Sequence, residues 1–132
     1  MAWRDARDVR DISCPDSAFE YMDNNLLASE GIRLVATPNL FYDEYGAYKK
    51  WPLALAVTSK RVIVVKPRMV GPKSWEYPIQ DFLRYSVGLF NGGGPSWEVR
   101  TEMQRGSLRF IFQTHDAAEF VAEYINSGGA MA

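Results

Sequence analysis

The chain has 132 residues, a length that fits a single globular domain. Hydrophobic residues make up 47% and charged residues 23%, which is enough apolar material for one core. Fifteen Lys and Arg against sixteen Asp and Glu leave a formal net charge of -1, so we expect no general binding to nucleic acid. One Cys excludes an internal disulfide framework, and one Cys with one His leaves few ligands for zinc. We therefore expect no metal and no cofactor.

Residues 1–14 form a polar stretch with alternating charges, which predicts a loose N-terminal arm before a single domain over residues 15–132. No apolar run of signal-peptide length follows this arm. The longest apolar stretches, residues 53–57 and 62–65, are far shorter than the roughly 20 residues of a membrane span. We therefore expect a cytoplasmic protein that is peripheral to a membrane where it contacts one.

A first helix is predicted over residues 15–28. Ser13 is a suitable N-cap, Pro15 suits the first turn, and Asp16 lies at the positive end of the helix dipole. Apolar side chains recur at helical spacing on one face: Phe19, Met22 and Leu26. This face should be buried against the rest of the domain.

Beyond Gly31 the apolar period changes to two, which predicts about seven short strands. The predicted strands cover residues 32–36, 53–57, 61–66, 75–79, 85–89, 97–103 and 108–112. The segment 41–50 is aromatic and acidic and is interpreted as a long hairpin connection. The three Gly at 92–94 lead into a strand and not a helix, so they predict a flexible hairpin and not a phosphate loop. Short strands with frequent turns are typical of an antiparallel sandwich or a partly open barrel.

A second helix is predicted after Thr114, which is a good N-cap, and it stops at the Ser-Gly-Gly of residues 127–129. Its apolar residues follow one wide face: Ala117, Phe120, Val121, Tyr124 and Ile125. A face this wide must cover other apolar surface, and the open end of a barrel is the simplest candidate.

Three local motifs occur in a characteristic order. A strand, a tight turn with a basic residue and an immediate return strand occupy residues 53–65. A strand then leads into a corner of proline, isoleucine, aspartate and a hydrophobic residue at 75–82, and a final strand at 110–112 precedes the helix that carries Ala118 and Phe120. In this order, over about residues 27–126, the chain resembles the bacterial branch of the pleckstrin-homology-like (PH-like or GRAM-like) family.

The resemblance implies a seven-stranded bent antiparallel sheet, or partly open barrel, capped by a C-terminal helix, to which this chain adds an N-terminal helix. It also implies a non-catalytic module that binds lipid headgroups, peptides or protein partners. Family members that bind phosphoinositides carry a basic signature across the first hairpin loop. The matching loop here is aromatic and acidic, with basic residues only at Lys49 and Lys50, which argues against specific phosphoinositide recognition.

The middle of the chain is its most basic part. Residues 51–80 hold five basic side chains against Glu76 alone. With the two lysines just before them, they suggest contact with a partner or lipid through Lys49, Lys50, Lys60, Lys66, Arg68 and Lys73. Each basic residue near an anionic membrane contributes about 1 kcal/mol. The alternative is an ordinary solvated hairpin tip whose charges do not share one face.

The aromatic loop is a second candidate interface, and it comprises Phe41, Tyr42, Tyr45, Tyr48 and Trp51. Exposed aromatic side chains anchor interfaces because they bury a large area at low cost in entropy. The alternative is that they cover the barrel as a second layer.

No residue pattern indicates an enzyme. His115 and Asp116 are adjacent on a helix and do not face each other, and no motif marks a nucleophile. Cys14 lacks a paired His or second Cys and is interpreted as a structural thiol.

We therefore expect a non-enzymatic binding module. It docks onto a protein partner, including a second copy of itself, or weakly onto an anionic membrane surface. The alternative is a carrier of a small ligand in an aromatic-lined barrel cavity. The bulky residues expected to point inward favour a filled interior: Trp97, Phe110, Phe112, Phe120 and Tyr124.

Overall fold

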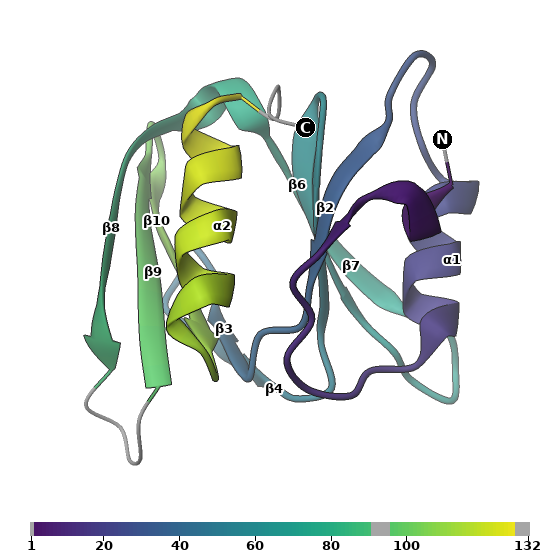
Figure 1. Ribbon diagram of the computed structural model, residues 1–132, viewed down its shortest axis with the longest axis horizontal. Coiled ribbons are helices and arrows are strands. Elements are labelled where there is room, and N and C mark those ends of the chain that lie inside the picture. Colours follow the sequence, from purple (N-terminus) through teal and green to yellow (C-terminus); the bar gives the residue numbers. More distant parts are fainter. Residues whose placement is uncertain (1, 91–95, 129–132) are drawn as a thin grey trace.

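The computed structural model describes residues 2–90 and 96–128. Two five-stranded sheets face each other across the core, and helix α2 (His115–Asn126) covers their open side (Figure 1). The predicted hairpin at 92–94 lies outside the described residues. So does Gly129, the last residue of the predicted stop signal of the second helix. The expected mainly β arrangement with a capping C-terminal helix is confirmed.

Sheet A has the order β1-β2-β5-β6-β7, and sheet B has the order β4-β3-β10-β9-β8. Sheet A contains β1 (Arg7–Asp8), β2 (Ile32–Ala36), β5 (Ala54–Thr58), β6 (Arg61–Lys66) and β7 (Lys73–Pro78). Sheet B contains β3 (Leu40–Tyr42), β4 (Tyr48–Lys50), β8 (Phe82–Phe90), β9 (Ser96–Met103) and β10 (Gly106–Phe112). Two short 3₁₀ turns, η1 (Trp3–Asp5) and η2 (Ile79–Asp81), and helix α1 (Asp16–Asn24) complete the described elements.

The structure has more strands than the seven predicted, because the segment 41–50, interpreted as a hairpin connection, forms most of β3 and all of β4, and the N-terminal arm forms β1. Pro38 separates β2 from β3, and Pro52 separates β4 from β5; proline cannot donate a ladder hydrogen bond. The chain passes from one sheet to the other at both prolines. The strand β1 pairs with β2 and forms one edge of sheet A.

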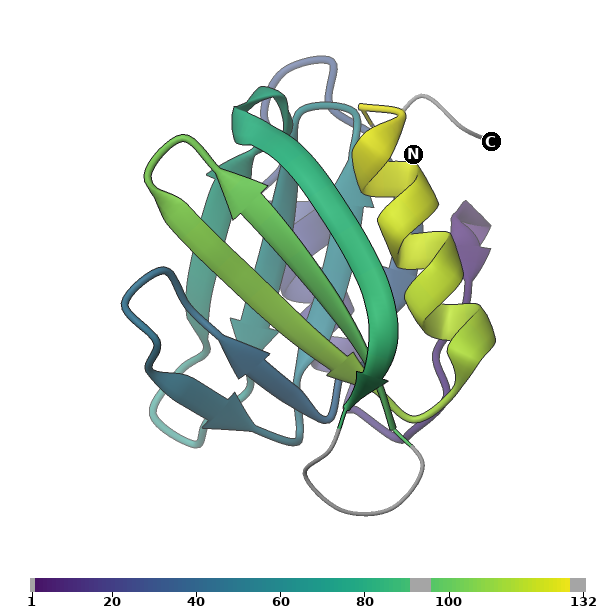
Figure 2. The same cartoon turned by 90° about the vertical axis from the view of Figure 1, so that its left-hand side faces the viewer.

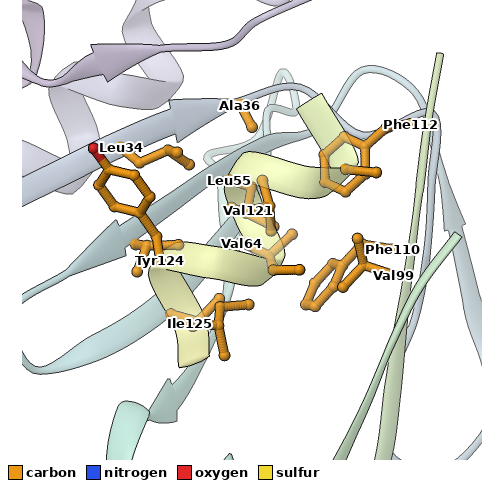
Figure 3. Packing of buried hydrophobic residues seen from close by; sticks show 14 of the residues in the cluster. Leu34, Ala36, Leu55, Val64, Val99, Phe110, Phe112, Val121, Tyr124 and Ile125 are labelled. Carbon is orange, nitrogen blue, oxygen red and sulfur yellow. The ribbon is translucent and has the colours of Figure 1, made fainter. Parts of the chain in front are cut away.

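The main core lies between the two sheets and α2 (Figure 3). Inward-facing residues alternate along the strands as the sequence predicted, and the apolar face of α2 closes the cluster. Phe110 and Phe112 are fully buried, as is Val99 on the neighbouring strand β9. Tyr124 from α2 is also buried, whereas Phe120 lies at the margin of the cluster. The interior is thus filled by side chains from three directions.

The N-terminal arm is packed, which corrects the expectation that it is loose. Trp3 is buried and stacks on Phe19 of α1 with ring centroids 5.0 Å apart. The strand β1 pairs in parallel with β2. The arm and α1 cover the outer face of sheet A, whose buried residues there include Ile32, Val35, Ala54, Ala56, Ile63 and Val65. Burial of these apolar side chains holds the arm against the sheet.

Helix α1 is shorter than the predicted span of 15–28. Pro15, and not Ser13, occupies the N-cap, and the helix ends before Asn25. The Asn25 side chain donates a hydrogen bond to the Tyr21 carbonyl, and the Leu27 amide donates to the Glu30 carboxylate. These bonds replace the helical pattern. Among the described residues, neither helix is long and apolar enough to cross a bilayer.

Candidate functional site

The end of β4 and the β6–β7 loop meet at one end of the molecule, at the lower left of the view in Figure 2. Lys66, at the end of β6, donates a hydrogen bond from Nζ to the Lys50 carbonyl at 2.7 Å. Lys73, opposite Lys66 in the β6–β7 ladder, has its ammonium 5.2 Å from the ring centre of Trp75. The hydrogen bond from Lys66 to the Lys50 carbonyl joins the end of β4 to the end of β6, where the β6–β7 loop begins. We call this surface the basic end, made of Tyr48, Lys50, Trp51, Lys66, Arg68, Met69, Val70 and Lys73.

The tip of the β6–β7 loop presents two apolar side chains to solvent. Met69 is fully exposed and Val70 is 87% exposed. The loop is closed beneath them by a hydrogen bond from Arg68 Nε to the Gly71 carbonyl at 3.0 Å. Gly71 has a φ of +108°, a conformation that suits glycine. The loop is therefore an ordered turn that points two apolar groups outward between basic neighbours.

The sequence predictions did not single out Met69 and Val70 as exposed apolar residues. The segment was interpreted only as a basic loop. The signal was present, since two apolar residues between Pro67 and Gly71 follow neither the alternation of a strand nor the period of a helix.

The predicted basic residues do not form one surface. Lys60 lies at the opposite end of β6, where its Nζ donates to the Ala28 carbonyl at 2.6 Å. A strand rises about 3.3 Å per residue, so roughly 20 Å separates Lys60 from Lys66 along the sheet. Lys49 is at the correct end, but its ammonium is bound to the Asp43 carboxylate. Lys60 is therefore not part of the basic end, and the charge of Lys49 is largely neutralised.

Asp43 is held as a carboxylate by its neighbours. Burial alone raises the pKa of Asp43, but hydrogen bonds from Lys49 and from the amides of Tyr45 and Ala47 outweigh burial and lower it. Lys49 also lies 5.1 Å from the ring centre of Trp75. The β3–β4 hairpin is thus stabilised by its own charges.

The turn end of the β5–β6 hairpin contains a buried ion pair. Arg61 Nε donates to Glu30 Oε2 at 2.9 Å, and the Glu30 side chain is 0% exposed. Thr58 Oγ1 also donates to Glu30, and Arg61 pairs with Glu76 at the surface. Burial alone raises the pKa of Glu30, but the bonds from Arg61 and Thr58 outweigh burial and lower it. These groups are structural.

The aromatic loop divides into buried and exposed parts. Phe41 is fully buried and stacks on Phe110 at 5.2 Å, so its prediction as an interface residue is wrong. It lies in β3, where alternation turns its side chain into the core. Tyr42 is half-buried beneath Arg109, whereas Tyr45 is 88% exposed. Tyr48 and Trp51 are also exposed, and Trp51 Nε1 donates to the Ser13 carbonyl.

Residues of the types that often catalyse reactions or bind metals are dispersed over the rest of the molecule. His115 Nε2 lies 3.0 Å from Glu119, and its ring packs edge-on against Trp97. Burial raises the pKa of Cys14 to about 11, which disfavours its thiolate. In the part of the chain that the structure describes, no three His, Cys, Asp or Glu residues gather where a metal ion could bind.

No protein-family model matches the chain, and no curated protein matches its sequence. Solved structures do resemble its fold. One is a DUF1696 family protein with a pleckstrin-homology domain from Shewanella loihica PV-4, with a TM-score of 0.57 and 11% identity, covering 89% of this chain and 94% of that chain. Another is the hSac2 domain from the human phosphoinositide phosphatase Sac2, with a TM-score of 0.55 and 12% identity, covering 83% of this chain and 76% of that chain. At such identities the likeness concerns the fold alone, and the fold of this chain is PH-like.

Proposed function

We propose that this protein is a non-enzymatic binding module that docks reversibly onto an anionic membrane surface through its basic end. The observation that carries the proposal is the exposed pair Met69 and Val70, flanked along the chain by Lys66, Arg68 and Lys73. We also infer membership of the bacterial PH-like family, which the fold and the order of the sequence motifs support.

The energetics fit weak attachment. Full transfer of a Met or Val side chain out of water is worth about 1.5–3 kcal/mol, and partial insertion is worth less. Each basic residue near an anionic surface adds about 1 kcal/mol, so three of them add about 3 kcal/mol before salt screening. The sum supports binding that is reversible and sensitive to ionic strength.

Aromatic side chains beside the tip suit the interface of a bilayer. Trp51 and Tyr48 are each about half exposed, and the Lys50 ammonium lies 5.6 Å from the Tyr48 ring centre. Trp and Tyr favour the headgroup region because one part of the ring is apolar and the other is polar. They would therefore lie at the depth of the headgroups when the loop tip enters the bilayer.

A protein partner is the second candidate, favoured by Tyr45. This residue stands on the β3–β4 turn, away from the β6–β7 tip, and its exposed ring is the kind of side chain that anchors protein interfaces. A small-ligand carrier has less support, because the barrel interior is occupied by the packed residues of the main core. The hollow between α1 and the β6–β7 loop, about 300 Å³, is an open depression lined by Ser17, Tyr21 and Arg68 among others.

The test is sedimentation with vesicles of phosphatidylcholine, with and without phosphatidylserine, at low and high salt. The protein should bind the anionic vesicles at low salt and release at high salt. Met69→Ser with Val70→Ser should reduce binding about tenfold or more, because the apolar contribution is removed. Leu27→Ser, a change at an exposed leucine outside the basic end, is the matched control. Equal binding to both kinds of vesicle, or to neither, contradicts the proposal.

A further inference from the structure

The outer faces of the two sheets differ in what covers them. The N-terminal arm and α1 pack on the outer face of sheet A. The outer face of sheet B points toward the viewer in Figure 2, and neither helix lies over it. The side chains that point outward from sheet B are therefore available to a partner.

Strand alternation places a distinct set of side chains on this face. Val99 and Thr101 of β9 are buried, so the residues between and beside them point outward. The ladder pairs extend this outward set across all five strands of sheet B. It includes three aromatic, four basic and two acidic side chains. We call this surface the arginine face, made of Tyr42, Tyr48, Lys50, Arg84, Ser86, Gly88, Phe90, Glu98, Arg100, Glu102 and Arg109.

Arg109 lies at the centre of the arginine face. It stands opposite Arg100 of β9 on one side and Tyr42 of β3 on the other. Its guanidinium carbon is 4.5 Å from the ring centre of Tyr42 and 5.9 Å from that of Phe90. Tyr48 continues the row, with its ring centre 6.1 Å from that of Tyr42. Aromatic rings and guanidinium groups thus lie side by side across the sheet.

The positive charge of the arginine face is only partly neutralised. Arg100 and Arg109 share the carboxylate of Glu98, at 3.3 Å and 2.6 Å. Arg84 pairs with Glu102 at 3.2 Å. The side chains of Arg84 and Arg100 are 78% and 54% exposed, so both guanidinium groups remain accessible. The four cations and two acids of this face leave a local excess of positive charge, although the whole chain has a net charge of -1.

A small hollow adjoins the two exposed arginines. Its volume is about 120 Å³, and its lining includes Arg84, Arg100 and Glu102. Ser86 also lines it and lies opposite Arg100 in the ladder, where its hydroxyl can donate a hydrogen bond to an oxyanion. At the next outward position, Gly88, an added Cβ would meet no described atom within 4 Å. The hollow therefore combines cationic and hydroxyl donors with open space beside them.

From these features we infer that the arginine face binds single-stranded RNA. Phosphates would lie against Arg84, Arg100 and Arg109, and bases would stack on the exposed ring of Tyr48 and on the guanidinium plane of Arg109. Basic surfaces with interleaved aromatic rings suit single strands, because every base has a π-face. The net charge predicted no general binding to nucleic acid, but a local surface of this kind requires only a local excess of positive charge.

The two acids of the face favour RNA over DNA. Glu102 lines the hollow between the arginines, and Glu98 lies between Arg100 and Arg109. A carboxylate accepts hydrogen bonds only, and the ribose 2′-hydroxyl is a donor that deoxyribose lacks. Each acid could therefore accept a hydrogen bond from RNA while the neighbouring arginines contact its phosphates.

A membrane or an acidic peptide fits this face less well. Its outward aliphatic residues are Leu40, which is half-buried, and Ile111, which is buried, so it has no exposed aliphatic tip to enter a bilayer. An acidic peptide would pair with the arginines but would leave the row of rings unused. The arginine face shares only Tyr48 and Lys50 with the basic end, so the inference goes beyond the proposed membrane docking.

The experiment measures binding of the whole chain to a fluorescently labelled oligouridine of about 12 nucleotides by anisotropy over a salt series. Three phosphate contacts predict that log Kd rises with log salt with a slope of about 2. An abasic oligonucleotide of equal charge should bind about tenfold or more weakly, because it lacks bases to stack. Oligodeoxyuridine should bind about threefold or more weakly than oligouridine. Polyglutamate of equal charge should compete about tenfold or more weakly than unlabelled oligouridine.

Matched variants locate the contact. Arg100→Ala should weaken oligouridine binding about three- to tenfold and lower the salt slope by about 0.7, whereas Arg33→Ala, at an exposed arginine of sheet A, should change neither. Arg109→Lys keeps the charge but removes the planar group, so it should weaken binding about tenfold with little change in the slope. Met69→Ser with Val70→Ser should leave RNA binding unchanged, which separates this face from the basic end.

Four results would overturn the inference. The first is no saturable binding of oligouridine at low salt. The second is equal binding of the abasic or the deoxy oligonucleotide, which would remove the role of the bases or the preference for RNA. The third is equal competition by polyglutamate, which would indicate an acidic protein partner. The fourth is an Arg100→Ala variant that binds as Arg33→Ala does, which would place the contact elsewhere.

Discussion

Basic residues at the two ends of strand β6 differ in whether they form ion pairs. At the start of the strand, Arg61 is buried against the Glu30 carboxylate and also pairs with Glu76. At the far end, Lys66 and its cross-strand neighbour Lys73 make no ion pair among the described residues, and the loop between them exposes Met69 and Val70. A cation is structural where an acidic group is buried beside it and available for binding where none is.

The two ends of β6 differ because different segments of the chain pack against them. The loop after α1 delivers Glu30 to the start of β6, and the amide of Leu27 and the hydroxyl of Thr58 complete its hydrogen bonds. The far end of β6 meets the end of β4, where Lys66 finds backbone carbonyls of Lys50 and Trp51 but no carboxylate. Carbonyl contacts leave the net positive charge in place.

The largest effect should come from removing the acid of the buried pair. Glu30→Ala should lower the free energy of unfolding by about 3–5 kcal/mol, because it leaves the Arg61 guanidinium partly buried without its main partner. Glu76→Ala removes the exposed partner and should cost about 1 kcal/mol or less. Urea unfolding measures both. Similar losses in the two variants would show that the start of β6 is not held by Glu30.

Acidification should destabilise the fold through Glu30 and Asp43. The pKa of Glu30 is lower in the folded protein, as is that of Asp43, so each carboxylate stabilises the fold at pH values above its unfolded pKa. That stability is lost as pH falls below the unfolded pKa, about 4.3 for Glu and about 3.9 for Asp, and through the folded pKa. Urea unfolding between neutral and acidic pH should show the decline, and Glu30→Gln should make it shallower. An unchanged pH dependence in Glu30→Gln would assign the decline to other carboxylates.

Charge reversal at the two ends should separate their contributions to membrane binding. Lys73→Glu replaces an attractive charge with a repulsive one at the basic end, which corresponds to about 2 kcal/mol, or roughly thirtyfold weaker vesicle binding at low salt. Lys60→Glu makes the same change at the other end of the sheet and should have little effect. Vesicle sedimentation across a salt series compares them. Equal losses would mean that binding follows net charge and not the basic end.

Regular alternation made much of this fold predictable. The strands at 97–103 and 108–112 and the apolar face of α2 follow from the apolar period, because each has one face on the main core. Sheet A shows where this signal stops. Ala54, Ala56 and Ile63 face outward from the main core but are covered by α1 and the arm, so the sheet is buried on both faces. A polar arm with one buried tryptophan gives little sequence signal for such packing.

The candidate sites were less predictable because they depend on contacts between distant segments. Composition identified a basic region, but pairing of Arg61 with Glu30 and of Lys49 with Asp43 requires knowledge of which acids lie nearby. Phe41 was assigned to an exposed loop because its three-residue strand is too short to show alternation. Strands β8, β9 and β10 were recognisable, but the row that their outward side chains form with Tyr42 depends on the order of all the strands.

The smallest predicted effect tests the boundary between structural and free cations. Lys49 lies next to Lys50 of the basic end, yet its ammonium is bound to Asp43 and packed over Trp75. Lys49→Met should therefore lower the free energy of unfolding by about 1 kcal/mol and weaken vesicle binding by less than about threefold. Lys73→Met, which removes an ammonium packed over the same ring but without an ion pair, should weaken vesicle binding more and stability less. If the two variants lose vesicle binding equally, the charge of Lys49 contributes to docking despite its pairing, and nearness to the basic end matters more than the carboxylate beside it.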